Sequence, residues 1–412
     1  MTDSDLHRSV EAVWRLECTR LIAALVRITR DVDLAEDLAQ DALETALSQW
    51  PDSGIPANPG AWLMAVAKRR AIDGFRRRER QDRAYGEVQK GQEDVVEGIE
   101  SSIDHVEDDV LRLMFICCHP ALSSDAQVTL TLRLLAGLTT REIARSFLTS
   151  EATIGARITR AKKTLAEVAA PMEEPADDER AARLSAVLGV VYLLFNEGYS
   201  ATSGDDWMRP ALCEEAVRLG RVLQSLAPLD PEVHGLTALM EIQLSRAAAR
   251  TGQDGEPVLL LDQDRSRWDQ LLIRRGMAAL ERAQNSVAPG PYTLQAQIAA
   301  CHARAHTAEA TDWSLIASLY ATLAVQTGSA VIELNRAVAV SMADGPAAGL
   351  ALVDQLQDDA TLTGYHLLPS VRGDLLAKLG RAEEARLEFE RAATLTQNAR
   401  ERTFLLDRAA GC

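Results

Sequence analysis

Residues 138–165 combine basic side chains with the pattern of two short helices. Thr139 and Glu142 have the spacing of a capping box, which begins a helix. A turn around residue 149 follows, and Ser150 can cap a second helix. The apolar positions of this second helix are Ile154, Ile158, Ala161 and Leu165. Burying that stripe turns the basic positions outward, so the segment predicts a helix-turn-helix whose second helix enters a DNA major groove. An ordinary helical hairpin with a solvated basic face is the alternative.

A second basic segment, residues 59–80, places an aromatic side chain beside guanidinium groups. Trp62, Val66 and either Arg69 or Arg70 fall one helical turn apart. Such a surface can hold phosphates and support unstacked bases. The alternative is a core tryptophan on a helix with a solvated basic end.

Acidic side chains recur along one helical face between residues 33 and 44. Asp33, Asp37, Asp41 and Glu44 follow at i, i+4, i+8 and i+11, beside an apolar stripe. The stripe consists of Leu34, Leu38, Ala42 and Ala46. Because an acidic face repels DNA, it suits a basic protein partner. Alternatively, Asp33 is a helix cap with Glu36 as its box partner, and the face is merely solvated.

Helices must position these segments, because strong helix formers dominate the chain and alternating β-branched runs are scarce. We therefore predict an all-α fold. Two acid-rich stretches of low apolar content divide it. The expected organisation is a helical module at 1–83, an acidic linker at 84–109, a helix-turn-helix module at 110–168, a linker at 169–180 and a helical-repeat extension at 181–412.

The net charge of −16 argues against a nucleic-acid binder only if the charge is evenly spread, and the sequence sorts its charges strongly. Residues 68–83 hold eight basic and three acidic side chains, net +5, and residues 141–163 hold six and two, net +4. Residues 87–109 hold nine acids and one lysine, net −8. Two basic islands, residues 68–83 and 141–163, therefore flank an acidic segment, residues 87–109, that repels DNA.

In this order, the segments resemble a known family. DLAEDLAQDAL (33–43) and AWLMAVAKRRAIDGFRRR (61–78) resemble region 2 of extracytoplasmic-function sigma factors, and GLTTREIA with EATIGARITRAKKTL resemble region 4. The resemblance implies a sigma factor that directs core RNA polymerase to promoters, with core polymerase (the β′ clamp helices and the β subunit) and promoter DNA as partners.

The resemblance also assigns site residues. It implies docking on the polymerase by Asp33, Glu36, Asp37, Gln40 and Asp41. It implies recognition and melting of the minus-ten element by Trp62, Lys68, Arg69, Arg70, Arg76 and Arg77. It implies reading of the minus-thirty-five element by Ser150, Thr153, Arg157, Arg160, Lys162 and Lys163. No catalytic residue, cofactor or metal is expected.

The extension predicts stacked helix pairs of a tetratricopeptide-like kind. Gly380, Ala385, Phe389 and Ala392 have the offsets of a repeat's second helix, and Gly345 precedes a similar helix 35 residues earlier. Four segments resemble the long extension of one sigma-factor subgroup: 193–201, 262–269, 311–313 and 334–340. Such an extension offers a concave surface for a protein or peptide ligand, or docks on the sigma modules, and we expect it to modulate activity.

Enzyme motifs for phosphate loops, zinc proteases and serine hydrolases are absent from the sequence. His302, His306 and Glu309 at i, i+4 and i+7 are interpreted as a packing or surface group rather than a metal site. Cys117 and Cys118 lie in an apolar stretch, which predicts buried thiols. The longest apolar run, residues 184–195, is shorter than a membrane span of about 20 residues. We expect a soluble, cytoplasmic protein with no membrane partner.

Two other classes of function remain open. A helix-turn-helix regulator with a repeat-type sensing domain would explain the basic islands but needs no polymerase-docking helix, so the acidic face at 33–44 separates it from a sigma factor. A repeat scaffold without a DNA role would leave both basic islands unexplained.

Overall fold

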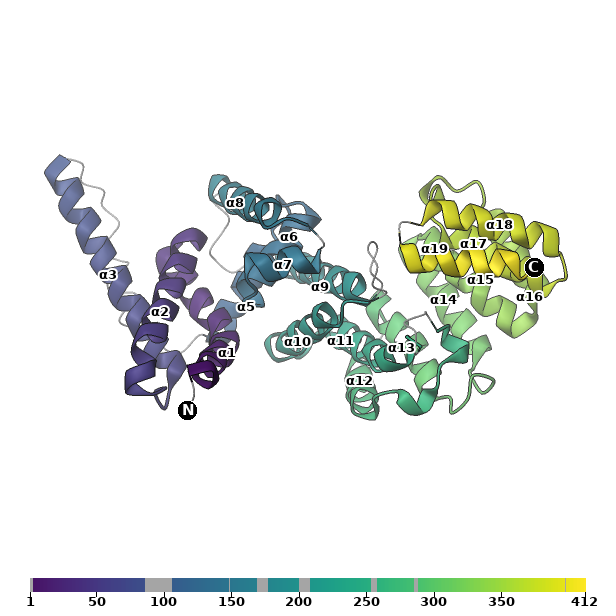
Figure 1. The fold of residues 1–412 in the computed structure, drawn as a ribbon, viewed down its shortest axis with the longest axis horizontal. Coiled ribbons are helices and arrows are strands. Elements are labelled where there is room, and N and C mark those ends of the chain that lie inside the picture. The colour runs from purple at the N-terminus through teal and green to yellow at the C-terminus, as the bar shows by residue number, and fades with distance from the viewer. Residues whose placement is uncertain are drawn as a thin grey trace. The chain divides into compact units, whose positions relative to one another are not determined.

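The computed structural model describes residues 3–85, 106–147, 149–168, 177–199, 208–252, 258–284, 288–396 and 398–412. These residues form helices and turns and contain no β-strand, which confirms the predicted all-α fold. The chain divides into two compact units, residues 1–191 (unit 1) and residues 192–412 (unit 2) (Figure 1). Most of the predicted acidic linker, and most of the linker at 169–180, lie outside the described residues.

Unit 1 begins with three packed helices, α1 (Asp3–Thr29), α2 (Val32–Ser53) and α3 (Pro59–Tyr85). Asp31 caps α2 by accepting hydrogen bonds from the backbone of Asp33 and Leu34 at 2.9 and 3.1 Å. The interpretation of Asp33 as the cap is therefore wrong, and its carboxylate is left for other partners. Figure 1 shows the far end of α3 extending away from α1 and α2.

The second module of unit 1 contains α5 (Val106–Cys117), α6 (Ser124–Leu130), the π-helix η1 (Thr131–Leu135), α7 (Thr140–Ser146) and α8 (Glu151–Glu167). The predicted capping box at the start of α7 is present, with both hydrogen bonds between Thr139 and Glu142. Ser150 accepts from the backbone of Thr153 at 3.1 Å and caps α8, as predicted. The four predicted apolar positions of α8 are all buried.

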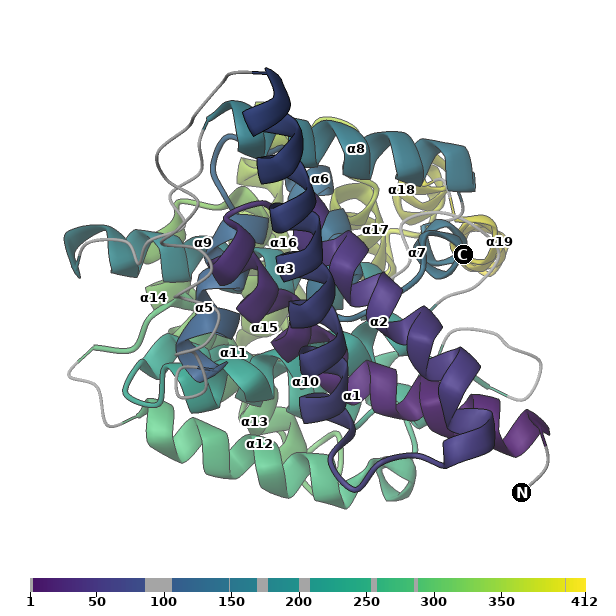
Figure 2. The same ribbon diagram turned by 90° about the vertical axis from the view of Figure 1, so that its left-hand side faces the viewer.

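The two modules pack directly on each other within unit 1, where α1 contacts α5 and η1 as well as α2 and α3. Six consecutive residues of α1, Leu21 to Val26, are buried, so this part of the helix is covered on every side. The Thr19 hydroxyl donates to the carbonyl of Leu135 at 2.7 Å. Figure 2 looks onto the face formed by α1, α2 and α3.

Helix α9 (Asp177–Tyr199) contains the boundary between the two units. Its residues Glu179–Tyr199 are long and apolar enough to cross a membrane by length and composition. The apolar side chains Leu184, Leu188, Leu194 and Phe195 are nevertheless buried, as in the core helix of a globular protein.

The described part of unit 2 also consists of successive helices. Its α-helices are α10 (Pro210–Leu226), α11 (Pro231–Leu244), α12 (Gln270–Ala283), α13 (Pro291–Arg304), α14 (Trp313–Thr327), α15 (Ala330–Asp344), α16 (Pro346–Gln355), α17 (Leu367–Lys378), α18 (Ala382–Leu395) and α19 (Ala399–Ala410). Its short 3₁₀ turns are η2 (Ala247–Ala249), η3 (Leu260–Asp262), η4 (Arg265–Arg267) and η5 (Ala360–Leu362). Most helices pack on the next helix along the chain.

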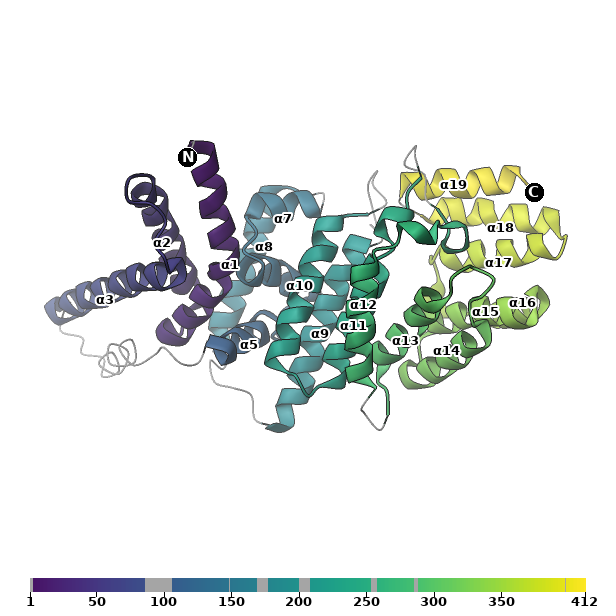
Figure 3. The same ribbon diagram turned by 90° about the horizontal axis from the view of Figure 1, so that it is seen from below.

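At the end of unit 2, consecutive helices pack on one another. Gly345 and Gly380 adopt φ values of 99° and 76° in the turns before α16 and α18, a conformation that favours glycine. On α18 the predicted inward positions Ala385, Phe389 and Ala392 are buried. They join one core with residues of α15, α16, α17 and α19, and α17, α18 and α19 lie side by side (Figure 3).

We expect Phe389→Ala to destabilise unit 2 by about 3–5 kcal/mol, because it removes a buried aromatic ring and leaves a cavity. Leu387→Ala on the same helix is the matched control, since Leu387 is 53% exposed and should change stability by less than about 0.5 kcal/mol. Thermal unfolding followed by circular dichroism measures both. Equal melting temperatures for the two variants would contradict this account of the core.

Candidate nucleic-acid and protein interfaces

The outer face of α8 carries most of the side chains predicted to read DNA. Thr153, Arg160 and Lys163 are exposed, and Lys163 lies 3.7 Å from Glu167. Arg157 is half-buried and pairs with Asp125 of α6 at 3.1 Å, so its guanidinium is fixed in position. Because the apolar stripe holds the opposite face in the core, these groups project together into solvent. The surface they form suits phosphates and the edges of bases.

Lys162 departs from this group. Its side chain is only 11% exposed and points to α2, where its ammonium pairs with the carboxylates of Asp33 and Glu36. Its hydrogen bonds with these two acids raise the pKa of Lys162 despite the opposing effect of burial. In this conformation Lys162 therefore contacts the first module and not the surface shared by Arg160 and Lys163.

The basic segment of α3 is arranged around two tryptophans. Trp62 is half-buried and packs against the buried ring of Trp50, with centroids 5.3 Å apart. Arg69 is exposed, while Arg70 pairs with Asp41 of α2 at 2.7 Å. Burial, and then the nearby Arg27, lower the pKa of Lys68. The side chains of the remaining two candidates, Arg76 and Arg77, lie outside the described residues.

The acidic side chains predicted on one face of α2 differ in their exposure and in their partners. Asp37 is exposed, and partial burial raises its pKa, with Lys162 opposing that effect and the neighbouring carboxylates adding to it. Asp41 is held by Arg70. Glu36 is buried, and Gln40 donates to its carboxylate at 3.1 Å. Solvent therefore reaches Asp33, Asp37 and Glu44, whereas Glu36 faces the second module.

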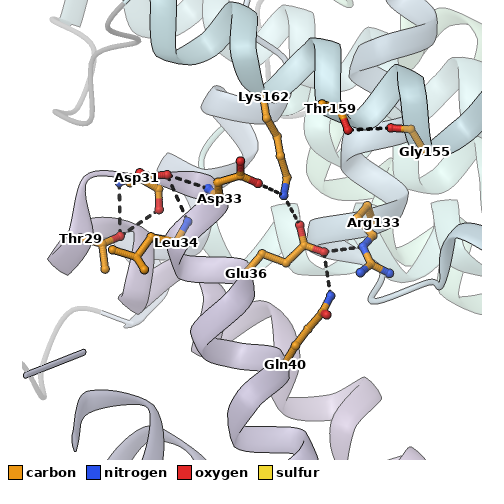
Figure 4. A network of polar contacts seen from close by, with 10 residues as sticks. All are labelled: Thr29, Asp31, Asp33, Leu34, Glu36, Gln40, Arg133, Gly155, Thr159 and Lys162. Carbon is orange, nitrogen blue, oxygen red and sulfur yellow. Dashed lines mark hydrogen bonds and ion pairs between the residues drawn. The ribbon is translucent and has the colours of Figure 1, made fainter. Parts of the chain in front are cut away.

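Figure 4 shows the network around Glu36. Arg133 of η1 donates from Nε to Glu36 Oε1 at 2.5 Å, and Lys162 Nζ lies 2.7 Å from Glu36 Oε2. A second NH group of Arg133 donates to the carbonyl of Leu138. Sequence reasoning misses Arg133, because it lies 97 residues from Glu36 and belongs to neither basic island. A separate ion pair, Arg27 with Asp109 at 2.9 Å, joins the same two modules.

Two groups of residues that the sequence offers for other chemistry are the cysteine pair and the histidine group. Cys117 and Cys118 are buried as predicted, and burial raises the pKa of Cys118 to about 12, which disfavours a reactive thiolate. The predicted helical spacing of His302 with His306 and Glu309 is wrong, because α13 ends at Arg304. Among the described residues, no three histidine, cysteine, aspartate or glutamate side chains form a group that could hold a metal ion.

Three of the four extension motifs converge in unit 2. Tyr199, from the first motif, has the Arg250 guanidinium over its ring at 3.7 Å, and its hydroxyl accepts a hydrogen bond from Arg246 at 3.0 Å. The Arg246 guanidinium also lies 5.9 Å from the centroid of Trp268, which belongs to the second motif. Segments remote in sequence are thus joined by arginine and aromatic side chains.

Arg265 connects this cluster to the third motif. Its guanidinium lies 4.9 Å from the Trp268 centroid and donates to the carbonyls of His302 and Ala305 at 2.6 Å and to the Thr311 hydroxyl at 3.3 Å. The His302 ring is buried edge-on against Trp313, and burial, followed by the nearby arginines, lowers its pKa to about 4. His302 is therefore neutral at physiological pH and packs as a core side chain. Of the fourth motif, Leu334 and Ala337 join a different core, whereas Ala339 joins the cluster against which Trp313 packs.

Comparison with known families matches the same modules. Residues 17–81 match Sigma-70 region 2, residues 112–165 match Sigma-70 region 4, and residues 183–284 match DUF6596, a family of unknown function. The two sigma matches cover α2, about half of α1, most of α3 and the helix-turn-helix.

One relative extends the comparison to most of the chain. The uncharacterized protein R00370 of Rhizobium meliloti (strain 1021) is 44% identical over 389 residues, which are 93% of this chain and 91% of that protein. The ECF RNA polymerase sigma factor SigK of Mycobacterium sp. (strain KMS) is 26% identical over 151 residues, 34% of this chain and 72% of that protein. No solved structure is significantly similar to the chain. The chain therefore belongs to the extracytoplasmic-function group of sigma-70 factors, with a C-terminal extension that includes a DUF6596 segment.

Proposed function

We propose that the protein is an alternative sigma factor that docks on the β′ clamp helices of core RNA polymerase through α2 and selects promoters through α3 and α8. The observation that carries this proposal is the separation of charge on unit 1: exposed basic side chains on α3 and α8, and exposed carboxylates on α2 between them. Basic faces attract DNA, whereas an acidic face needs a protein partner. The proposed activity consists of binding and of separating the DNA strands, so it requires no catalytic group.

The two DNA surfaces differ in kind. On α3, Trp62 is half-buried and Arg69 is exposed seven residues further along the helix, a combination that suits unstacked bases of a melted minus-ten element. On α8, Thr153 and Arg160 project from a rigid helix, which suits a duplex minus-thirty-five element. This difference supports promoter opening by the first module and positioning of the protein on the promoter by the second.

The central experiment is transcription in vitro with purified core polymerase on a library of genomic fragments. We expect initiation from a subset of fragments, and we expect Asp37→Lys to weaken core binding by about tenfold or more, because like charges at an interface cost several kcal/mol. Asp52→Lys, at another exposed position near the end of α2, is the matched control. No stimulation on any fragment and no copurifying core would favour a regulator that does not bind polymerase.

Arg160→Ala should weaken binding to minus-thirty-five DNA and reduce the slope of log K against log salt concentration by about 0.9 for each phosphate that the guanidinium neutralises. Arg282→Ala, an exposed position on α12, removes the same charge outside the sigma modules and should leave the slope unchanged. Fluorescence anisotropy over a salt series measures both. An unaltered slope for Arg160→Ala would place the DNA surface elsewhere.

We propose further that the extension is a tetratricopeptide-like array that binds a protein or peptide and modulates transcription. The convergence of three motifs on Arg265 and Trp268 supports a specific structural role for this region. Two turns with positive φ, at Gly345 and Gly380, support the repeat pairing.

Arg265→Lys should change transcription in vitro, up or down, because lysine keeps the charge but cannot make the three hydrogen bonds of the guanidinium. Arg267→Lys is the matched control, since Arg267 is exposed in the same turn. Thermal unfolding is measured in parallel. A lowered melting temperature with unchanged transcription would show that the extension does not modulate the sigma modules.

A further inference from the structure

We propose that the arginine and aromatic side chains that meet in unit 2 form a binding site for an oxyanion, namely the carboxylate or phosphate group of a small molecule. Arg246 and Arg265 are its principal contacts. All residues of this cluster lie in unit 2. The inference goes beyond the proposed function, because it concerns the extension alone and holds whether or not the chain binds polymerase.

The cluster gathers positive charge around aromatic rings. The guanidinium groups of Arg246 and Arg265 lie 5.9 and 4.9 Å from the centroid of the Trp268 ring. A third guanidinium, that of Arg250, lies over the ring of Tyr199, whose hydroxyl accepts a hydrogen bond from Arg246. Burial, and then the charge of Arg246, lower the pKa of Arg265. Cations held this close together repel one another, and an anion bound among them relieves that repulsion.

No carboxylate of the described residues forms an ion pair with Arg246 or Arg265. Glu309 opposes the lowering of the pKa of Arg265, but its carboxylate is exposed and makes no ion pair with it. Elsewhere in unit 2 arginines do find such partners, as Arg221 does in the buried Glu241 at 2.7 Å. Acids are also abundant, since residues 192–412 contain 28 acidic and 20 basic side chains. Two clustered arginines without a counter-ion in so acidic a unit point to an anion from outside the chain.

The cluster also has unused hydrogen-bonding capacity in its interior. Three buried polar atoms have no hydrogen-bond partner within the part of the chain that the structure describes: Arg246 Nε, Trp268 Nε1 and His302 Nδ1. The side chains of Trp268 and His302 are only 4% and 7% exposed. Buried polar atoms without partners are rare in folded proteins and call for an ion, a water or a ligand. Two of the three atoms are N–H donors, which is the type of group that an anion requires.

Other contacts fix the two arginines in place before any ligand binds. Arg265 donates to the carbonyls of His302 and Ala305 and to the hydroxyl of Thr311. Arg246 donates to the Tyr199 hydroxyl at 3.0 Å. These bonds use only some of the N–H groups that a guanidinium carries. Both side chains are half-buried, so solvent still reaches them. A ligand therefore loses little free energy in ordering the site.

The surroundings favour a small anion over a nucleic acid. Guanidinium groups match the geometry of carboxylates and phosphates, to which they donate paired hydrogen bonds. Three exposed carboxylates, Asp262, Asp264 and Asp269, lie within four residues of Arg265 in the sequence. A DNA duplex laid across the site would be repelled by these acids, whereas a small anion can contact the guanidinium groups without approaching them.

The test is isothermal titration calorimetry of the full chain with inorganic phosphate and with succinate, at constant ionic strength set by sodium chloride. We expect saturable binding of at least one of the two anions, and the tighter one identifies the site as selective for phosphate or for carboxylate. Succinamide has the same carbon skeleton without charge and should not bind. If neither anion binds saturably, or if succinamide binds as well as succinate, the oxyanion site is refuted. Because polymerase is absent from this assay, its result is independent of the proposed function.

Arg246→Gln locates the binding in this cluster. We expect the affinity for the anion to fall by about tenfold or more, because a charged hydrogen-bond donor is lost. Arg274→Gln, at an exposed position on α12, removes the same charge from the same unit and should keep the affinity. Equal affinities for the two variants would show that the anion binds elsewhere.

Arg246→Lys gives a second measurement that does not depend on how Arg246→Gln folds, since it keeps the positive charge. Lysine lacks the planar fork of the guanidinium, so we expect an affinity below that of the unaltered chain. Circular dichroism of each variant checks that its helices are intact. Full affinity in a folded Arg246→Lys variant would overturn the role of the Arg246 guanidinium.

Discussion

The arrangement of unit 1 depends on how a buried carboxylate is compensated. Glu36 lies among apolar residues of α2, where an isolated charge would be strongly unfavourable. Two cations and one amide, all within hydrogen-bonding distance, make its burial tolerable. Because both cations come from the second module, charge as well as apolar packing joins the two modules at this point.

Local features of the fold can be predicted from sequence because they depend on neighbouring residues. The capping box of Thr139, the cap at Ser150 and the buried stripe of α8 each follow from spacing within a few helical turns. The prediction that Asp33 caps α2 is wrong because Asp31 has the same chemistry two residues earlier. Spacing alone offers no reason to prefer one acid over the other.

The pairing of the modules cannot be predicted in the same way. Lys162 and Asp33 are 129 residues apart, and helical periodicity assigns both to outward faces. A side chain that points away from its own helix is buried when another helix packs over it. No local sequence pattern predicts that packing. The extension motifs show the same limit: each resembles its family segment separately, but the meeting of three of them around Arg265 and Trp268 follows from tertiary packing.

Helix α9 has a consequence for how the protein can be divided. The DUF6596 match begins at residue 183, and the boundary between the compact units falls after Val191, yet both positions lie inside this one helix. A gene that ended at either position would encode a broken helix, and the side chains of Leu194 and Phe195 would be missing from the core. A truncation that keeps this helix whole must therefore be cut outside residues 177–199.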